Sequence, residues 1–302
     1  MDIYIERKAD EDFNRARFRE SLGRISALVQ PSRQELLSLS EVKSLVKPQG
    51  EAYQGITAVS IEKIVGSEGR YRDFNKAFLP RREMLRHRWK RVDKAHLQSV
   101  ILPPIRLYEV GGVYFVRDGN HRVSVARSQG AEMIDAEITK IDSKIKLDPG
   151  ITREELKRRV TEYEKKEFYK NTNFGKIVDY ELNFTSPGRY DEVLNHIHTH
   201  KYFMNQNRTD EIPFEEAVKS WFETVFIPIV RIIEEENLLV RFPGRTSADL
   251  YVWIVKHWDE LKKKYGPDYS LKDAAMDFSE KHGKGFRERL KDFFGIGKKP
   301  AT

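Results

Sequence analysis

The stretch from residue 105 to residue 141 constrains the fold of this chain more than any other. It begins with two β-rich runs, Ile105 to Tyr108 and Val113 to Arg117, separated by Gly111-Gly112, which predicts a β-hairpin. The second run leads directly into the polar sequence DGNHR at residues 118–122. A short helical pattern with Val123 and Ala126 then follows and ends at Gly130. The stretch closes with a third alternating run, residues 136–141. A strand, a glycine-containing turn, a helix and a closing strand are therefore predicted in that order.

A turn that joins a strand to a helix N-terminus is suited to binding an anion. The free N–H groups of the first helical turn and the positive end of the helix dipole point the same way. His121 and Arg122 lie on this first turn, where a cation opposes the dipole and an anion would offset it. The simpler interpretation also stands at this point: Asp118-Gly119 would be an ordinary turn, Asn120 a helix cap and Arg122 a solvated cation.

The surroundings of this turn resemble the ParB/sulfiredoxin superfamily, whose members carry a strand, a Gly-x-x-Arg type phosphate loop, a helix and a closing strand. ParB proteins use the loop to bind CTP, whereas sulfiredoxins and free-serine kinases with a DGHHR-like loop use it to bind ATP. The resemblance implies that nucleotide phosphates lie at Gly119, Asn120, His121 and Arg122. The matching segments follow in the same order and at similar spacing: Leu102-Pro103-Pro104-Ile105, Tyr114-Phe115, Gly119-x-His121-Arg122 and Ile134-Asp135-Ala136.

One departure from the superfamily excludes one activity. The sulfiredoxin loop reads Gly-Cys-His-Arg and uses the cysteine as its nucleophile, but this chain has Asn120 at that position and no cysteine anywhere. Thiol chemistry is therefore excluded, and the protein is not a sulfiredoxin.

Composition predicts a soluble protein with enough apolar residues for a packed core. Apolar residues make up 39% of the 302 residues and charged residues 33%, and the mean hydropathy is −0.64. No apolar run approaches the ~18–20 residues needed to span a bilayer, so no membrane contact is expected. The N-terminus lacks the apolar centre of a signal peptide, and the absence of cysteine fits a cytoplasmic location.

Positive charge is concentrated in residues 70–94. This segment carries ten Lys or Arg residues and three acids, a net charge of +7 that equals the net charge of the whole chain. A local excess of this kind points to an anionic partner more strongly than a high pI does. Arg70 and Arg72, in the loop before the basic helix, are candidates for nucleotide phosphate binding by analogy with the superfamily; a solvated loop is an equally good interpretation.

The same segment predicts an amphipathic helix from Arg81 to Lys94. Leu85, Trp89 and Val92 form its apolar stripe. On the opposite side, Arg86, Lys90 and Lys94 are candidates for contacting the phosphates of DNA or of a nucleotide. A charged face in contact with solvent alone is the alternative.

The predicted fold class is α+β. N-terminal helices (residues 1–55, with helices at 11–29 and 32–46) precede a small ParB/sulfiredoxin-like mixed-sheet domain at 56–145. A mainly helical C-terminal domain follows at 146–302. Within it, Thr246 and Asp249 predict a capping box at the start of a helix. The phrase RFPGRTSADLYVWIVKHWDEL in the same region resembles a bacterial family of ParB-like proteins that has no assigned activity.

A histidine triplet in the C-terminal domain does not predict a metal site. His196, His198 and His200 would share one face of a strand, but no fourth ligand at a suitable spacing supports a metal site.

Three functions follow as hypotheses. The first is a nucleotide-binding regulator that takes CTP or ATP, with or without Mg²⁺, and contacts DNA through residues 70–94; a homodimer is compatible with it. The second is an ATP-dependent small-molecule kinase or NTPase, in which Asp118, Glu62 or Glu68 would be the base or hold Mg²⁺. The third is a non-catalytic interaction module. A nuclease is not supported, because no carboxylate cluster suggests a two-metal centre.

Overall fold

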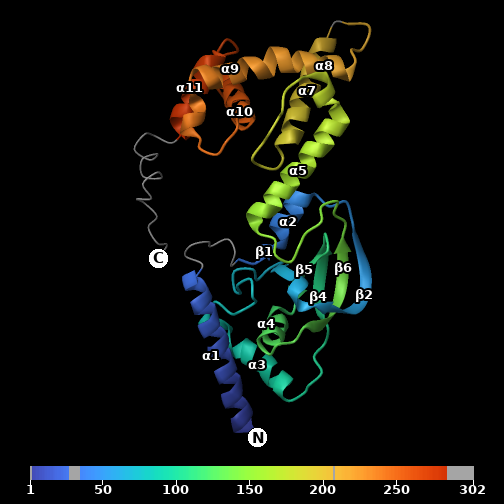
Figure 1. Cartoon of the computed structure of the whole chain (residues 1–302), viewed down its shortest axis with the longest axis vertical. Coiled ribbons are helices and arrows are strands. Elements are labelled where there is room, and N and C mark those ends of the chain that lie inside the picture. The colour runs from blue at the N-terminus through green and yellow to red at the C-terminus, as the bar shows by residue number, and fades with distance from the viewer. Residues whose placement is uncertain (1, 27–34, 207, 284–302) are drawn as a thin grey trace. The chain divides into compact units, whose positions relative to one another are not determined.

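The computed structural model describes residues 2–26, 35–206 and 208–283 (Figure 1). The chain divides into two compact units, residues 1–160 and residues 161–302, and each is described by itself. The first unit unites the N-terminal segment and the sheet domain that the sequence prediction separated at residue 55.

A six-stranded mixed sheet forms the centre of the first unit. Its strands are β1 (Leu37–Ser38), β2 (Glu51–Ser60), β3 (Ile64–Ser67), β4 (Ile105–Val110), β5 (Val113–Asp118) and β6 (Met133–Ile141). They lie in the order β1-β3-β5-β4-β6-β2. β1, β3 and β5 run parallel to one another, β5 and β4 form the predicted hairpin, β4 and β6 are parallel, and β6 and β2 are antiparallel. The hairpin and the closing strand are confirmed.

β2 begins at Glu51, before the residue 56 at which the sheet domain is predicted to start. Most of its side chains are exposed, so no apolar alternation marks its first half. Main-chain pairing with β6 defines it instead, from Glu51 opposite Ile141 to Ser60 opposite Met133. Gly55, with φ +87°, absorbs the register shift within this edge strand.

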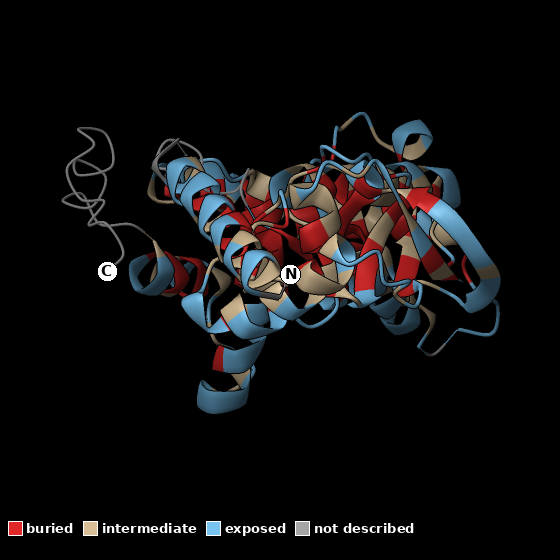
Figure 2. Ribbon diagram, turned by 90° about the horizontal axis from the view of Figure 1, so that it is seen from below, coloured by how far each residue is buried: buried red, intermediate tan, exposed pale blue. Residues whose placement is uncertain are grey.

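Three helices of the first unit meet at one buried tryptophan. These are α1 (Asp2–Ser26), α3 (Arg86–Leu97, after a 3₁₀ turn at Glu83–Leu85) and α4 (Asn120–Ser128). Trp89 on α3 is fully buried; its ring packs edge-on against Phe13 of α1, and its Nε1 donates to Ser124 Oγ of α4 at 2.9 Å. In Figure 2 the outward face of α1 and most of the edge strand β2 are exposed, while the middle of the sheet is buried.

The N-terminal helices also differ from their predicted bounds. α1 begins at Asp2 rather than near residue 11. Ser32, where the second helix is predicted to begin, lies outside the described residues. α2 begins only at Leu39 and ends at Val46, because Leu37 and Ser38 pair with β3 as strand β1.

The described part of the second unit contains helices and connecting loops but no strand. α5 (Arg153–Thr172) crosses the boundary between the units. The buried core of this unit includes Trp221, Phe226 and Tyr251. The predicted capping box of Thr246 and Asp249 is confirmed at the start of α10. The remaining helices are α6 (Phe174–Ile177), α7 (Arg189–Asn205), α8 (Phe214–Trp221), a π-helical segment (Phe222–Phe226), α9 (Ile227–Glu235), a 3₁₀ turn (Leu238–Arg241), α10 (Ser247–Tyr265) and α11 (Leu271–His282).

The histidine triplet lies on α7 and not on a strand, so the expectation of a shared face is wrong. Residues two apart on a helix point about 200° apart, which follows from 3.6 residues per turn. His196 Nδ1 pairs with the Tyr251 hydroxyl at 3.0 Å, His200 Nε2 with Ser220 Oγ at 2.9 Å, and His198 packs on Phe214. These side chains bind the helices of the second unit to one another.

The predicted α+β class, a mixed sheet with helices before it and a mainly helical C-terminal half, is confirmed. Within the described residues, no helix has both the length and the apolar character needed to cross a membrane.

Candidate functional site

The candidate site lies at the edge of the sheet where three parallel strands end. Ser38 of β1 lies opposite Ser67 of β3, and Ser67 lies opposite Val116 of β5. The carboxyl ends of β1, β3 and β5 therefore meet at one edge, the usual place for a ligand in sheets with parallel strands. β1 leads into α2, β3 into the loop at 68–80, and β5 into the predicted DGNHR turn and α4.

Gly119 makes the sharp turn from β5 into α4. Its φ of +106° lies in the region that favours glycine, and a Cβ there would come within 2.5 Å of Ile105 Cγ2. No side chain caps the start of α4 at this residue. The turn therefore needs glycine, and it leaves N–H groups of the first helical turn without an intrahelical partner.

Two buried polar side chains follow directly. Asn120 is 7% exposed and His121 is 5% exposed, yet Asn120 Oδ1 and both ring nitrogens of His121 lack a hydrogen-bond partner within the described chain. Leaving a buried polar group unpaired costs about 1–3 kcal/mol, so native proteins rarely do it without a functional reason. The Asn120 amide can present its NH₂ group at the same position by rotating about its last bond.

Burial and nearby cations keep His121 neutral. The ring packs edge-on against Phe74 with centroids 5.3 Å apart. Desolvation, followed by the charges of Arg88, Arg70 and Arg91, lowers the pKa of His121 to about 4. A neutral imidazole offers one N–H donor and one acceptor, which suits a hydrogen bond to a ligand oxygen.

Arg88 and Arg91 of α3 supply the positive charge beside His121. Both are exposed, and neither has an acidic partner in the part of the chain that the structure describes. They flank Trp89, whose hydrogen bond to Ser124 holds α3 against α4 one turn beyond His121. The sequence prediction counted both arginines in the basic segment but did not place them at the site. The sequence pattern that could have indicated their place at the site is their position next to the apolar Trp89 on a predicted helix.

Arg122, a predicted phosphate ligand, is already engaged within the protein. Its guanidinium donates to the Pro103 carbonyl, to the Pro104 carbonyl at 3.0 Å and to Asp118 Oδ2 at 2.5 Å. The side chain is 15% exposed. In this arrangement Arg122 fastens the segment before β4 to the turn, and Asp118 carries a neutralised charge.

The structure separates the other predicted site residues. Arg70 pairs with Asp73 at 3.1 Å and contributes to the field at His121, whereas Arg72 lies over the Tyr71 ring and lines a cavity. Glu68 directly follows β3 and so shares the sheet edge with Asp118.

Glu62 precedes β3 and lies at the opposite edge, near Arg127. The three predicted catalytic carboxylates, Asp118, Glu62 and Glu68, are therefore not brought together.

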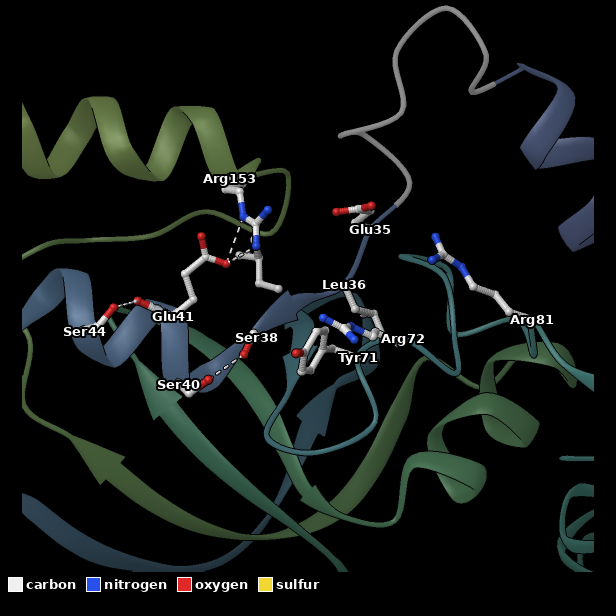
Figure 3. Close-up of a pocket in the computed structure, with 11 residues that line it drawn as sticks. Glu35, Leu36, Ser38, Ser40, Glu41, Ser44, Tyr71, Arg72, Arg81 and Arg153 are labelled. Carbon is white, nitrogen blue, oxygen red and sulfur yellow. Dashed lines mark hydrogen bonds and ion pairs between the residues drawn. The ribbon is translucent and has the colours of Figure 1, made fainter. Parts of the chain in front are cut away.

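The cavity that Arg72 lines lies where β1, α2 and the loop after β3 meet (Figure 3). Its volume is about 620 Å³. Arg153, near the start of α5, closes one side through two hydrogen bonds to Glu41, at 2.9 and 2.5 Å. Nothing in the sequence pattern indicated this cavity, because its walls come from residues more than 100 positions apart.

The predicted DNA-binding residues Arg86, Lys90 and Lys94 face α1 instead of solvent. Arg86 reaches Asp10 at 3.1 Å, and Lys90 reaches Asp10 at 2.6 Å and Glu6 at 2.5 Å. Lys94 pairs with Glu6. Neither the predicted phosphate contacts nor the alternative of a face in contact with solvent alone included these ion pairs, because α1, which the sequence does not position, supplies the counter-charges.

No group of three or more His, Asp or Glu side chains arranged for a metal ion occurs among the described residues. The sheet edge offers Asp118, tied to Arg122, and the exposed Glu68. A Mg²⁺ ion at this edge would therefore be held mainly by ligand phosphates and water, as is usual for nucleotide-bound Mg²⁺.

No protein-family model matches this chain, and no curated protein matches it. Among solved structures it is similar to sulfiredoxin from Arabidopsis thaliana, with 24% identity, 28% of this chain and 84% of that chain covered, and a TM-score of 0.22. It is also similar to two structures of the pNOB8-like ParB N-domain, at 12% and 13% identity. These cover 82% and 81% of this chain and 100% and 92% of those chains, with TM-scores of 0.21 and 0.22.

Proposed function

We propose that this protein binds a nucleoside triphosphate, CTP or ATP, with its phosphates at the first turn of α4. The observation that carries the proposal is His121, 5% exposed with both ring nitrogens unpaired at a helix N-terminus. A phosphate oxygen at this point would accept from the imidazole and from the free main-chain N–H groups. It would also meet the positive end of the helix dipole.

Charge supports a polyphosphate ligand in particular. Arg88 and Arg91 have no acid to pair with among the described residues, and Arg70 adds to the same field. A nucleotide triphosphate carries several negative charges, and guanidinium groups bind phosphate in a forked geometry. The resemblance of the Gly119–Arg122 sequence to the ParB/sulfiredoxin superfamily supports the same ligand class.

Association with DNA, and with it a ParB-like regulatory role, is a further proposal with a narrower basis. The residues first assigned to it, Arg86, Lys90 and Lys94, are compensated by α1. A kinase has less support than nucleotide binding alone, because Asp118 is paired with Arg122 and Glu62 lies at the far edge of the sheet.

The sharpest test replaces His121 with phenylalanine. If the histidine serves a ligand, H121F loses most of its nucleotide affinity while thermal stability stays equal or rises, because an unpaired buried polar group has been removed. If the histidine is structural, stability falls and affinity follows only through unfolding. Isothermal titration with ATP, CTP, GTP and UTP, with and without Mg²⁺, and thermal melts measure both quantities.

A matched pair of double variants tests the charges. We expect R88M/R91M to weaken nucleotide binding by at least about tenfold, since each charged hydrogen bond contributes about 1.5–3 kcal/mol. K90M/K94M removes the same net charge from the same helix and should leave affinity within about twofold, well under the 1.4 kcal/mol of a tenfold change. Equal losses in both variants, or no nucleotide bound by the wild-type protein, would refute the proposal.

A further inference from the structure

The cavity between β1, α2 and the loop after β3 has the features of a second ligand site. Its volume of about 620 Å³ falls within the roughly 300–1,000 Å³ typical of small-molecule pockets. It opens at the same sheet edge as the α4 turn but on neighbouring strands. Two residues of the loop after β3 belong to different sites: Arg70 contributes to the electrostatic field at His121 of the α4 turn, and Arg72 lines the cavity.

Arginines outnumber acids in the lining of the cavity, although one of them, Arg81, has an ion pair of 3.9 Å with Glu20 outside the lining. Arg72, Arg81 and Arg153 line the cavity together with two carboxylates, Glu35 and Glu41. Glu41 is held by the forked hydrogen bonds of Arg153, as the dashed lines in Figure 3 show. Arg72 is exposed and lies over Tyr71, with no acidic partner among the described residues. The lining therefore favours a ligand that carries negative charge.

Hydroxyl groups form the part of the lining nearest to α2. Ser38 Oγ and Ser40 Oγ share one hydrogen bond of 2.8 Å, and the Ser38 side chain does not cap the helix that it precedes. Because each hydroxyl is one donor and two acceptors, this pair retains capacity for a ligand. Tyr71 adds a phenolic hydroxyl from the loop after β3, and Glu35 adds an acceptor (Figure 3).

From this combination we infer that the cavity binds a small organic anion that carries both carboxylate and hydroxyl groups. The guanidinium of Arg72 receives the carboxylate, and the serine pair and Glu35 receive the hydroxyl. A guanidinium matches a carboxylate in a forked geometry, which a simple halide or an uncharged sugar cannot use. This site is distinct from the proposed nucleotide site and does not require it.

The probe is L-malate, with succinate as the matched compound that lacks the hydroxyl and glycerol as the one that lacks charge. Isothermal titration should show saturable binding of malate that is at least about tenfold tighter than binding of succinate. One additional satisfied hydrogen bond contributes about 1.4 kcal/mol, which corresponds to this factor. Glycerol should not bind. Absence of malate binding up to about 10 mM overturns the inference, because titration to this concentration detects even a binding free energy weaker than about 4 kcal/mol. Equal binding of malate and succinate overturns the assigned hydroxyl contacts.

Variants locate the site. R72M should abolish malate binding, whereas R106M, which removes an exposed arginine paired with Glu137 on β4 and β6, should not change it. S38A/S40A should erase the preference for malate over succinate. Unchanged malate affinity in R72M would place the binding elsewhere and refute the inference.

Nucleotide titration of the same R72M variant keeps the two proposals apart. It should retain the wild-type affinity for ATP or CTP, because Arg72 lines the cavity and not the α4 turn. If nucleotides fail to bind while malate binds, the proposed function falls and the second site stands.

Discussion

The two faces of α3 carry similar charge and differ in what surrounds them. On one face Arg86, Lys90 and Lys94 meet Glu6 and Asp10 of α1, and Lys90 is only 14% exposed at its side chain. On the other face Arg88 and Arg91 have no acid beside them in the described chain and lie near a buried, unpaired histidine.

The lesson of this contrast concerns how a basic segment is interpreted. A count of lysines and arginines measures the charge of the chain, but a binding site requires charge that the fold has left uncompensated. The face of α3 that bears Arg86, Lys90 and Lys94 (the α1 face) therefore joins two helices. The face that bears Arg88 and Arg91 (the α4 face) is the one available to a ligand.

The largest expected effect comes from the residue that separates the two faces. Trp89→Ala removes a fully buried ring, and the loss of packing should lower the stability of the first unit by about 3–5 kcal/mol. Both faces would lose their support, so nucleotide affinity should fall as well. Hydrogen exchange of β5 and α10 amides during urea unfolding reports on each unit separately.

Trp221→Ala is the control, because Trp221 is equally buried but belongs to the second unit. It should destabilise α10 and leave nucleotide affinity unchanged. Equal loss of affinity in both variants would show that the measurement follows general unfolding and not the geometry of α3.

The next effect is the pH dependence of the α4 face. The folded pKa of His121 is about 4 and the model-peptide value is 6.5, so the unfolded state takes up the proton first as pH falls. The stability due to neutral His121 is present above pH 6.5 and is lost as pH falls toward 4, amounting to about 3 kcal/mol. At pH 7 the unfolding free energies of wild type and H121F should therefore lie close together, and at pH 4 wild type should fall below H121F by up to about 3 kcal/mol, because phenylalanine takes up no proton. Parallel curves for the two proteins would contradict the assignment.

A smaller effect is expected when the α1 face is deprived of its acids. E6Q/D10N should lower stability by about 1 kcal/mol, because these ion pairs are partly exposed. It should also release Arg86, Lys90 and Lys94 and increase affinity for duplex DNA at low salt, with a steeper salt dependence. Gel shifts across a salt series measure this.

Glu11→Gln combined with Glu154→Gln changes the net charge by the same amount without touching the α1–α3 face, and it serves as the control for E6Q/D10N. Equal gains in DNA affinity from both double variants would mean that net charge, and not the released face, is responsible.

The smallest effect concerns a carboxyl buried on the α1 side of α3. Asp93 is fully buried, and desolvation raises its pKa even though Gln129 donates to it at 2.8 Å. A raised folded pKa means that stability is lost as pH rises through that pKa, so Asp93→Asn should increase the melting temperature at pH 7 by a few degrees at most. Below the unfolded pKa the two proteins should melt alike. A lower melting temperature for Asp93→Asn at pH 7 would contradict this account.

The sequence by itself determined the local geometry of this protein. Alternation and the Gly-Gly pair predicted the β4–β5 hairpin, Thr246 and Asp249 predicted the start of α10, and the DGNHR turn predicted a strand that enters a helix with a free N-terminus. These features depend on residues within a few positions of one another. Their backbone preferences and side-chain periods are written in the chain itself.

Only the tertiary structure decided which charges are available to a ligand. Asp10 and Lys90 are 80 positions apart, Arg153 and Glu41 are 112 apart, and no periodic pattern links such pairs. The walls of the cavity likewise come from residues more than 100 positions apart. A side chain's chemistry depends on its neighbours in space, because Coulomb energy and desolvation act over a few ångströms and take no account of position along the chain.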